Sequence, residues 1–290
     1  MGLQLPSRAA APLKRSVQGA VLGLSVLALG ACSAEDKDQI GRLAMPSPAS
    51  DRAPEIFELW KWSWVAAMAV GVLTWGLMFY AAWRFRRTST NLVPVQTRYN
   101  LPLEIFYTVA PILMVIVFFF HTVNTQNAVT EKVDDPDITI DVVGQQWSWT
   151  FNYTDQGEGG TTPYVVGTTA DRPKLVLPVD QLVEFRLHSP DVIHSFMIDS
   201  FLMKLDVIPG RVNTFQATPT VTGEFRGKCF ELCGVYHSRM LFDVEVVTAA
   251  EYDAYLDELQ ENPDNVAQAP VLGGSDVNTQ PGLETEGDDQ

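Results

Sequence analysis

Four of the few sulfur and imidazole side chains of this chain gather in one short stretch. The 290 residues include only 3 cysteines and 4 histidines, and Cys229, Cys233, His237 and Met240 all fall within 229–240. A second imidazole, His194, ends an Asp-Val-Ile-His sequence 35 residues before the first of these cysteines. Soft sulfur combined with imidazole selects copper or zinc, and a methionine in the set favours copper. A mononuclear blue-copper site needs His, Cys, His and a weak axial Met, so the second cysteine is left to bridge a second copper.

Three other interpretations of these residues stay open. Cys229 and Cys233 could form a disulfide if their domain faces an oxidising compartment. They could also hold structural zinc together with His194 and His237, or the cluster could be incidental. The Cys-x3-Cys spacing alone is weak evidence. The histidine four residues later, the methionine three residues after that and the upstream Asp-Val-Ile-His together favour copper.

Two long apolar segments precede this region and would have to anchor it. The 22 residues that follow Lys61 are uncharged and carry aromatic residues at both ends, as transmembrane helices do. The second segment is interrupted only by Glu104 and His121. Neither segment has a polar face, which argues against buried helices of a soluble core. We therefore predict transmembrane helices over 59–83 and 103–123.

The flanks of these helices predict how the chain is oriented. The loop 84–102 contains four arginines and no acid, so the positive-inside rule places it in the cytoplasm and both termini outside. Residues 1–31 have a basic start and an apolar run too short to span a bilayer, followed by Leu-Gly-Ala-Cys. This pattern resembles a lipoprotein signal peptide with Cys32 as the lipidated residue, although an ordinary signal peptide that meets a cysteine is the alternative. Residues 32–58 would then be an extracytoplasmic segment.

After the second helix the pattern changes to alternating apolar and polar residues. Several short alternating segments separated by Gly and Pro predict an all-β sandwich or barrel over 124–247. Residues 154–173, with four glycines, are expected to form a surface loop. The alternating segments are 137–143, 147–151, 182–187, 211–215 and 241–246.

The C-terminal part is predicted to contain one helix and a disordered tail. Thr248 and Glu251 have the spacing of a capping box, which predicts a helix over 248–262. Residues 263–290 are polar and acidic and are expected to be disordered. The whole chain has a net charge of −15 with 46% hydrophobic residues, too acidic for a nucleic-acid binder and too apolar for a disordered protein.

These features together resemble subunit II of the haem-copper cytochrome c oxidases, the subunit that carries the binuclear CuA centre. The resemblance covers nearly the whole chain after residue 31, and it implies a two-helix transmembrane hairpin followed by a cupredoxin-like β-barrel. It also implies a set of copper ligands: the bridging thiolates of Cys229 and Cys233, the imidazoles of His194 and His237, the weak thioether of Met240 and the backbone carbonyl of Glu231.

The same resemblance implies roles for residues around the copper. The Glu231 side chain would bind a Mg²⁺ or Mn²⁺ ion shared with subunit I. Gly-Gln-Gln-Trp-Ser-Trp looks like the aromatic segment over the copper, with Trp147 as the electron entry point; a buried core aromatic is the alternative. Asp191 would support the ligand loop. Glu104 resembles a glutamate at the mouth of a proton path into subunit I, although it could equally be an interfacial carboxylate beside Arg98.

The sequence also departs from the family pattern. Ser148 separates Trp147 from Trp149, where family members often have adjacent aromatics, and 154–173 looks like an insertion. His188 and His121 are not at ligand positions and are interpreted as a surface strand residue and an interfacial residue. No Cys-x-x-Cys-His sequence occurs, so we expect no c-type haem bound to this chain.

The implied function is that of an aa3-type terminal oxidase subunit in a bacterial cell membrane. It would accept electrons from cytochrome c, or from a membrane-bound cytochrome c domain in a bc1-aa3 supercomplex, and pass them to subunit I. Subunit I would supply the haems, reduce O₂ to water and couple this to proton pumping, with subunit III as a further partner. The acidic charge suits a basic cytochrome, and no nucleic acid is expected. The alternatives are a copper-free quinol-oxidase subunit II and a membrane-tethered copper-binding or assembly protein.

Overall fold

The computed structural model describes residues 34–87, 96–154, 156–275, 277 and 279. The chain divides into two units, residues 1–46 and 47–290. In the first unit the described residues form one short helix, α2 (Ala34–Gly41), within the segment predicted to be extracytoplasmic. The predicted signal peptide and Cys32 lie outside the described residues.

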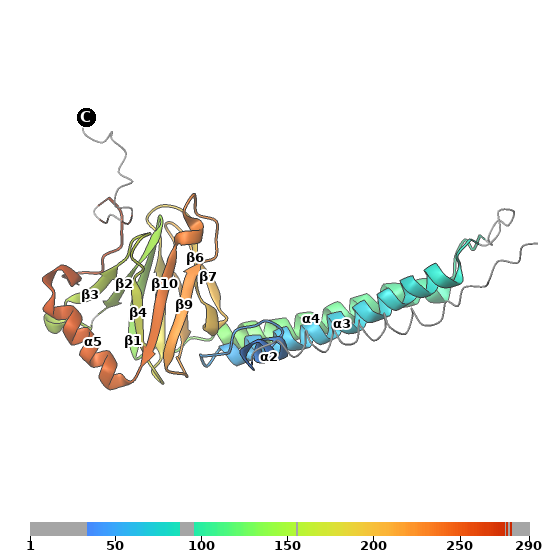
Figure 1. Ribbon diagram of the computed structural model, residues 1–290, viewed down its shortest axis with the longest axis horizontal. Helices are drawn as coiled ribbons and strands as arrows, with labels where there is room; N and C mark the ends of the chain where they lie inside the picture. Colours follow the sequence, from blue (N-terminus) through green and yellow to red (C-terminus); the bar gives the residue numbers. More distant parts are fainter. Residues whose placement is uncertain (1–33, 88–95, 155, 276, 278, 280–290) are drawn as a thin grey trace, which may run out of the picture. The chain divides into compact units, whose positions relative to one another are not determined.

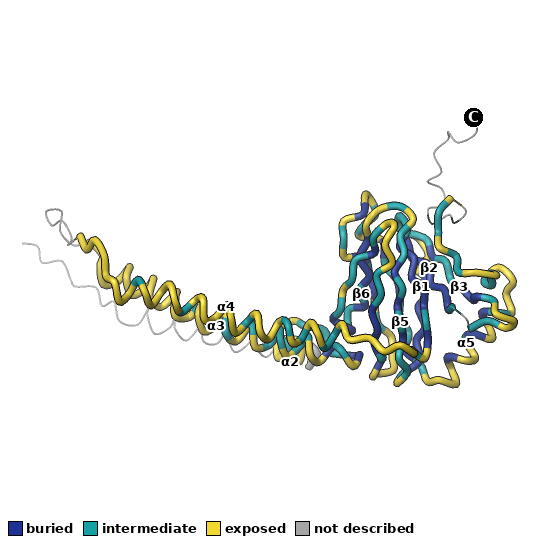
Figure 2. Tube along the Cα trace, turned by 180° about the vertical axis from the view of Figure 1, so that it is seen from behind, coloured by how far each residue is buried: buried dark blue, intermediate teal, exposed yellow. Residues whose placement is uncertain are grey.

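Two long helices open the second unit. α3 (Ala53–Arg84) and α4 (Leu101–Thr130) contain the two predicted spans, and both are long and apolar enough to cross a membrane. Figure 2 shows them mostly in the colour of exposed residues. Both helices extend beyond 59–83 and 103–123, because the uncharged stretches mark only what a bilayer core would enclose while the helical backbone continues through polar turns. The two predicted spans are thus confirmed as apolar helices, with longer bounds.

Hydrogen bonds fasten the ends of these helices to each other and to the β domain. The Arg52 guanidinium donates to the carbonyl of Ala128, which joins the start of α3 to the last turn of α4 at 2.7 Å. After α4, the side-chain amide of Gln216 accepts from Val133 N at 2.7 Å and donates to Val133 O at 2.8 Å. A glutamine amide that both donates and accepts in this way forms the same two hydrogen bonds to Val133 that a residue of a neighbouring strand would form.

The β domain consists of two sheets, in agreement with the predicted fold class of two apolar helices followed by an all-β domain (Figure 1). The first sheet has the order β11-β3-β2-β1-β5-β8 and contains β1 (Ile138–Gln145), β2 (Ser148–Thr154), β3 (Thr162–Val166), β5 (Val183–His188), β8 (Asn213–Ala217) and β11 (Val266–Ala267). The second has the order β4-β10-β9-β6-β7 and contains β4 (Lys174–Pro178), β6 (His194–Ile198), β7 (Lys204–Val207), β9 (Gly223–Cys229) and β10 (Leu241–Val247). The pairs β1–β5 and β4–β10 are parallel, and the other ladders are antiparallel.

Aromatic side chains from both sheets fill the space between them. Trp149 of β2 packs against Phe196 of β6 and Phe242 of β10, each with ring centroids 5.5 Å apart. Phe196 and Phe242 are stacked at 5.0 Å. Such pairs contribute about 0.5–1.5 kcal/mol each beyond the area they bury. Gly227 of β9 makes room for this cluster, since a Cβ there would lie 1.9 Å from the ring of Phe242.

The helix α5 (Ala249–Glu261) follows β10 and has the predicted capping box. Thr248 Oγ1 accepts from Glu251 N at 3.4 Å, and Glu251 Oε2 accepts from Thr248 N at 2.9 Å. The apolar side of α5 packs against the β domain, and the ring of Tyr252 lies 6.2 Å from that of Tyr153. The sequence-based prediction of this helix is confirmed within one residue at each end.

Two predictions about irregular segments are wrong. The predicted loop 154–173 contains β3, which pairs with β2, because its Thr-Pro-Tyr-Val-Val run completes a sheet whose edge would otherwise be open. The tail predicted to be disordered contains the short helix η4 (Pro263–Asn265) and β11, and its described residues up to Thr279 bond to the first sheet. Their polar composition indicated that they lack a core of their own, but it did not reveal partners on other strands.

Candidate metal centre

The two strands β6 and β9 bring His194 and Cys229 together although 35 residues separate them. His194 is the first residue of β6, Cys229 is the last of β9, and Phe196 and Cys229 are register partners. The Cys229 amide donates to Met240 O and the Phe230 amide donates to Ser195 O, each at 3.0 Å. These backbone bonds fix both ends of the 229–240 loop against the second sheet.

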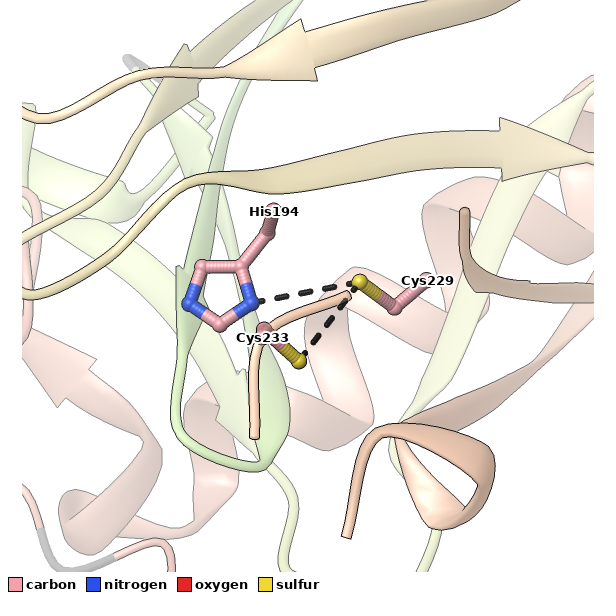
Figure 3. A group of neighbouring side chains, drawn as sticks. All are labelled: His194, Cys229 and Cys233. Atoms are coloured by element: carbon pink, nitrogen blue, oxygen red, sulfur yellow. Dashed lines mark hydrogen bonds between the residues drawn. The ribbon is translucent and has the colours of Figure 1, made fainter. Parts of the chain in front are cut away.

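The side chains of two histidines and a methionine place their donor atoms around the thiol sulfurs of two cysteines. The Sγ atoms of Cys229 and Cys233 lie 3.9 Å apart. His194 Nδ1 lies 3.9 Å from Cys229 Sγ, and His237 Nδ1, from the short helix η3 (His237–Arg239), lies 3.6 Å from Cys233 Sγ. Met240 Sδ lies 3.7 Å from Cys233 Sγ. Figure 3 shows His194 and the two cysteines pointing at a common space.

The spacing of these donors fits coordination of a metal. Two sulfurs bound to one metal at about 2.3 Å, with tetrahedral to trigonal angles, lie about 3.8–4.0 Å apart, and the observed separation is 3.9 Å. A disulfide would need about 2.0 Å, and both cysteines are free. The carbonyl oxygen of Glu231 adds an oxygen donor 3.2 Å from Cys229 Sγ. The donor set offers two thiols, two imidazoles, a thioether and a carbonyl, which suits copper better than a hard cation.

Water is largely excluded from the thiols. His194 and Met240 are 0% exposed, and the two cysteines 6% and 5%. A hydrogen bond from Cys233 lowers the pKa of Cys229, against the opposing effect of burial, and the same bond raises the pKa of Cys233. The two thiols are therefore coupled, so that one proton leaves readily and the other is retained. A bound metal cation would displace that proton, because thiols coordinate as thiolates.

Asp191 orients the His194 ring. Asp191 Oδ1 lies 2.9 Å from His194 Nε2, and its Oδ2 accepts from the Gln146 amide at 2.7 Å. Burial lowers the pKa of His194, but the hydrogen bonds with Asp191 and Cys229 outweigh it and raise the pKa. An ionised carboxylate can only accept a hydrogen bond, so in the neutral ring Nε2 carries the proton and the lone pair of Nδ1 faces the sulfurs, as metal-binding imidazoles require. Asp191 supports the imidazole of His194 and contributes no atom to the cluster.

Trp147 lies in the β1–β2 turn and contacts the 229–240 loop, here called the ligand loop because it carries most of the clustered donor atoms. Its Nε1 donates to the Cys233 carbonyl at 3.3 Å, and its ring meets that of Tyr236 edge-on at 5.1 Å. The approach depends on Gly234, with φ of 134°, because a Cβ there would lie 2.8 Å from Trp147 Nε1. The alternative, a core aromatic, describes Trp149, which is 0% exposed, whereas Trp147 is half-buried at the edge of the core.

Gln146 is a site residue that we did not single out from the sequence. Its side-chain Nε2 donates to the Cys233 carbonyl at 2.6 Å, while its backbone amide bonds Asp191. It therefore joins the support of one imidazole to the loop that carries both thiols. The only signal was its place in Gly-Gln-Gln-Trp, and a polar residue in a turn has many ordinary explanations.

Three other predicted residues lie apart from the cluster. Glu104 sits in the first turn of α4, where its Oε1 accepts from Asn100 N at 2.9 Å while Asn100 Oδ1 accepts from Leu103 N at 3.4 Å. This is a helix-capping arrangement. His188 on β5 bonds Asp141 at 2.7 Å and is partly buried, not a free surface residue. His121 lies on α4 beside Phe120, with ring centroids 5.5 Å apart.

Comparison with known proteins places this cluster in a family. Residues 138–247 match the family model for the periplasmic domain of cytochrome c oxidase subunit II. A protein of Streptomyces avermitilis named probable cytochrome c oxidase subunit 2 is 42% identical over 86% of this chain and 88% of its own length. Cytochrome c oxidase subunit 2 of Corynebacterium glutamicum is 32% identical over 89% of this chain and 90% of its own.

Among solved structures, the periplasmic domain of cytochrome oxidase subunit II from Bradyrhizobium japonicum is 31% identical. The match covers 45% of this chain and 98% of the Bradyrhizobium chain, with a TM-score of 0.40. The Streptomyces and Corynebacterium relatives match 86% and 89% of this chain, so the match is not confined to the β domain. The chain described here therefore belongs to the family of cytochrome c oxidase subunit II and is a two-helix subunit of that terminal oxidase.

Proposed function

We propose that this chain holds a binuclear CuA centre that takes electrons from cytochrome c and delivers them to subunit I. The observation that carries the proposal is the pair of buried sulfurs, 3.9 Å apart, with one imidazole Nδ1 beside each. A mononuclear site would leave one of the two buried thiols uncoordinated. The ligands are proposed to be His194, Cys229, Glu231 through its carbonyl, Cys233, His237 and Met240.

When bound, such a centre would supply a one-electron store shared between two coppers. The chain's own residues would keep the geometry of that store nearly constant. His194 and Cys229 belong to paired strands and Met240 directly precedes β10, so none of these side chains can move far without breaking ladder hydrogen bonds. Ligands held on a rigid scaffold impose one geometry on both oxidation states, which keeps the reorganisation energy of electron transfer low.

Trp147 is the proposed point of electron entry. Its indole Nε1 bonds the carbonyl of Cys233, so the ring is one hydrogen bond away from the backbone of a proposed ligand. The partly exposed position of Trp147 would let a docked cytochrome approach this ring. The acidic chain, with net charge −15, favours a basic donor by electrostatic steering. The donor is proposed to be cytochrome c, either free or as a domain within a bc1-aa3 supercomplex.

The remaining parts of the proposal concern the rest of the oxidase. The arginine-rich segment 84–102 would face the cytoplasm, which puts the β domain on the opposite side of the membrane. Subunits I and III are the proposed neighbours. The Glu231 side chain, half-buried within the ligand loop, is proposed to bind Mg²⁺ or Mn²⁺ at the subunit I interface. Glu104, at the other end of the membrane helices, is proposed to open a proton path into subunit I.

Metal analysis combined with EPR tests the copper proposal. Purified oxidase should contain two copper atoms per copy of this chain beyond the copper of subunit I. The EPR spectrum should show one unpaired electron shared by two copper nuclei. A single copper per chain, or zinc in its place, would contradict the proposal. An assembly protein would also lose its copper to an added apo-acceptor, whereas an electron-transfer centre should retain it through repeated turnover.

A further inference from the structure

The described C-terminal residues 266–275, 277 and 279, here called the strap, cross the outer face of the first sheet. The strap starts as β11, in which Val266 and Ala267 pair with Pro163 and Thr162 at the edge strand β3. In Figure 1 this red segment follows α5 and passes β3 and β2. Its later contacts are made to β2, then to β1, and finally to the β1–β2 turn.

Two side-chain amides hold the strap as if it were a further strand. On β2, Asn152 Oδ1 accepts from Val271 N at 2.7 Å and its Nδ2 donates to Val271 O at 3.1 Å. On β1, Gln145 Oε1 accepts from Gly274 N at 2.9 Å and its Nε2 donates to Gly274 O at 3.1 Å. Each amide satisfies both the donor and the acceptor of one strap residue, which a chance surface contact would not do.

Burial on the polar face of β2 agrees with a lasting cover. Neighbouring side chains of a strand point to opposite faces, and Trp149 and Phe151 fill the core side. The intervening Ser148, Thr150 and Asn152 point to the other face, yet they are 1%, 2% and 0% exposed. Polar residues on an outer face are normally solvated. A segment that bonds Asn152 from that side accounts for part of this burial.

The last described residue of the strap, Thr279, contacts the β1–β2 turn beside the proposed metal centre. Thr279 is 2% exposed, and its hydroxyl donates to the Gln146 carbonyl at 2.6 Å. The amide of Gln146 bonds Asp191, and its side chain bonds the Cys233 carbonyl. Gln146 is thus tied to the strap, to the support of His194 and to the ligand loop.

We propose that the strap is a positioning element, and Thr279 a positioning residue, that holds the Gln146–Trp147 turn against the ligand loop for electron entry. This role rests on the proposed function of Trp147. The strap reaches no ligand itself. It acts by closing the outer side of a turn whose inner side carries Trp147, so that the indole keeps its bond to Cys233.

The first test is amide hydrogen exchange of the segment 145–149 in the intact oxidase. Thr279→Val removes the hydroxyl with little change of shape, and we expect the segment's exchange to become about fivefold faster, the factor that corresponds to one net hydrogen bond. The separate variant Thr279→Ser keeps the hydroxyl and should exchange these amides at the wild-type rate. A chain ending at Pro270, which lacks Val271 and all later residues, should show a larger increase.

A matched control is Thr161→Val, which removes a threonine hydroxyl that likewise donates to a carbonyl, that of Glu158 at 2.9 Å. It should leave exchange of 145–149 unchanged. The second readout is the stopped-flow rate at which reduced cytochrome c passes its electron to copper. We expect Thr279→Val to slow this step severalfold while the copper content and spectrum stay as in the wild type.

The outcomes separate this proposal from the proposed function. Unchanged exchange in both Thr279→Val and the truncated chain would overturn the strap's role, whatever metal is present. Faster exchange with an unchanged rate of electron entry would also overturn it, because the turn would then be held for stability alone. Failure of the copper proposal would show instead as missing copper in the wild type, and the exchange measurement does not depend on that metal.

Discussion

The carboxylate of Asp191 joins the imidazole of His194 to the backbone of Gln146. Its Oδ1 lies 2.9 Å from His194 Nε2, and its Oδ2 accepts from Gln146 N at 2.7 Å. Burial raises the pKa of Asp191, but the hydrogen bonds from His194, Gln146 and Val192 outweigh this and lower it. The carboxylate is therefore ionised and fixes the ring with Nδ1 towards the sulfurs.

Asp191→Asn should weaken copper binding about 10–100-fold, the usual effect of losing a partner that orients a metal-binding imidazole. The amide keeps the shape but removes the charge that favours Nε2–H. Competition with a copper chelator measures the affinity. Asp243→Asn is the control, since Asp243 is half-exposed and pairs only loosely with Arg172 at 3.9 Å. Equal weakening in both variants would contradict the orienting role.

Cys229→Ser and Cys233→Ser should each abolish the binuclear EPR signal, because both sulfurs are proposed bridges. Met240→Leu should retain two coppers with a shifted reduction potential, since a thioether is a weak ligand. EPR, metal analysis and potentiometry distinguish these results. Cys32→Ser, which changes the third cysteine, should leave the signal intact. A two-copper signal that survives the loss of either thiol would sink the bridging assignment.

Trp147→Gln should slow copper reduction by cytochrome c at least tenfold without altering the copper spectrum. The substitution removes the ring while keeping a side-chain donor for the Cys233 carbonyl, which Trp147 bonds at 3.3 Å. Tyr236→Phe keeps the adjacent ring and is the control. Stopped-flow mixing with reduced cytochrome c gives the rate. Electron entry at the wild-type rate in Trp147→Gln would place the entry point elsewhere.

Glu104 requires two substitutions, because its carboxylate also caps α4 by accepting from Asn100 N. Glu104→Gln keeps this acceptor and removes the ionisable proton, whereas Glu104→Ala removes both. A proton-path role predicts that both variants slow steady-state turnover severalfold while electron transfer from cytochrome c to copper stays normal. Time-resolved kinetics separate the two steps. Wild-type turnover in Glu104→Gln would leave Glu104 as a helix cap only.

Asp141 should make the β domain sensitive to acid. Burial raises the pKa of this carboxyl, but hydrogen bonds with His188 at 2.7 Å and Thr154 at 2.6 Å outweigh burial and lower the pKa. A lowered pKa in the folded state adds stability above the unfolded value of about 3.9, and this stability is lost as pH falls through the folded-state pKa.

We therefore expect Asp141→Asn to reduce the free energy of unfolding at pH 7 by about 1.5–3 kcal/mol. The difference from the wild type should shrink below about pH 4, where the wild-type carboxyl is itself being protonated. Urea unfolding of the β domain, followed by tryptophan fluorescence over a pH series, measures it. Asp171→Asn, in an exposed loop, is the control. A difference that stays constant down to pH 2 would show that the charge is not responsible.

The sequence by itself predicted a metal site and the class of fold. Cysteine and histidine are so rare here that their clustering in 229–240 indicates metal binding, and local patterns predict α3, α4 and the cap of α5. These signals are local: an uncharged run of 22 residues or a Thr-x-x-Glu sequence acts through neighbours along the chain. Predicting these helices therefore does not require knowing which residues of other elements they contact.

Only the tertiary structure decided which distant groups meet. His194 reaches Cys229 through the pairing of β6 with β9, and Gln146 joins Asp191 to Cys233 across a turn. The strap was predicted to be disordered because its polar residues cannot form a core. Its order comes from backbone groups that bond to the amides of Asn152 and Gln145. Every residue carries such backbone groups, so composition and periodicity cannot show where they find partners.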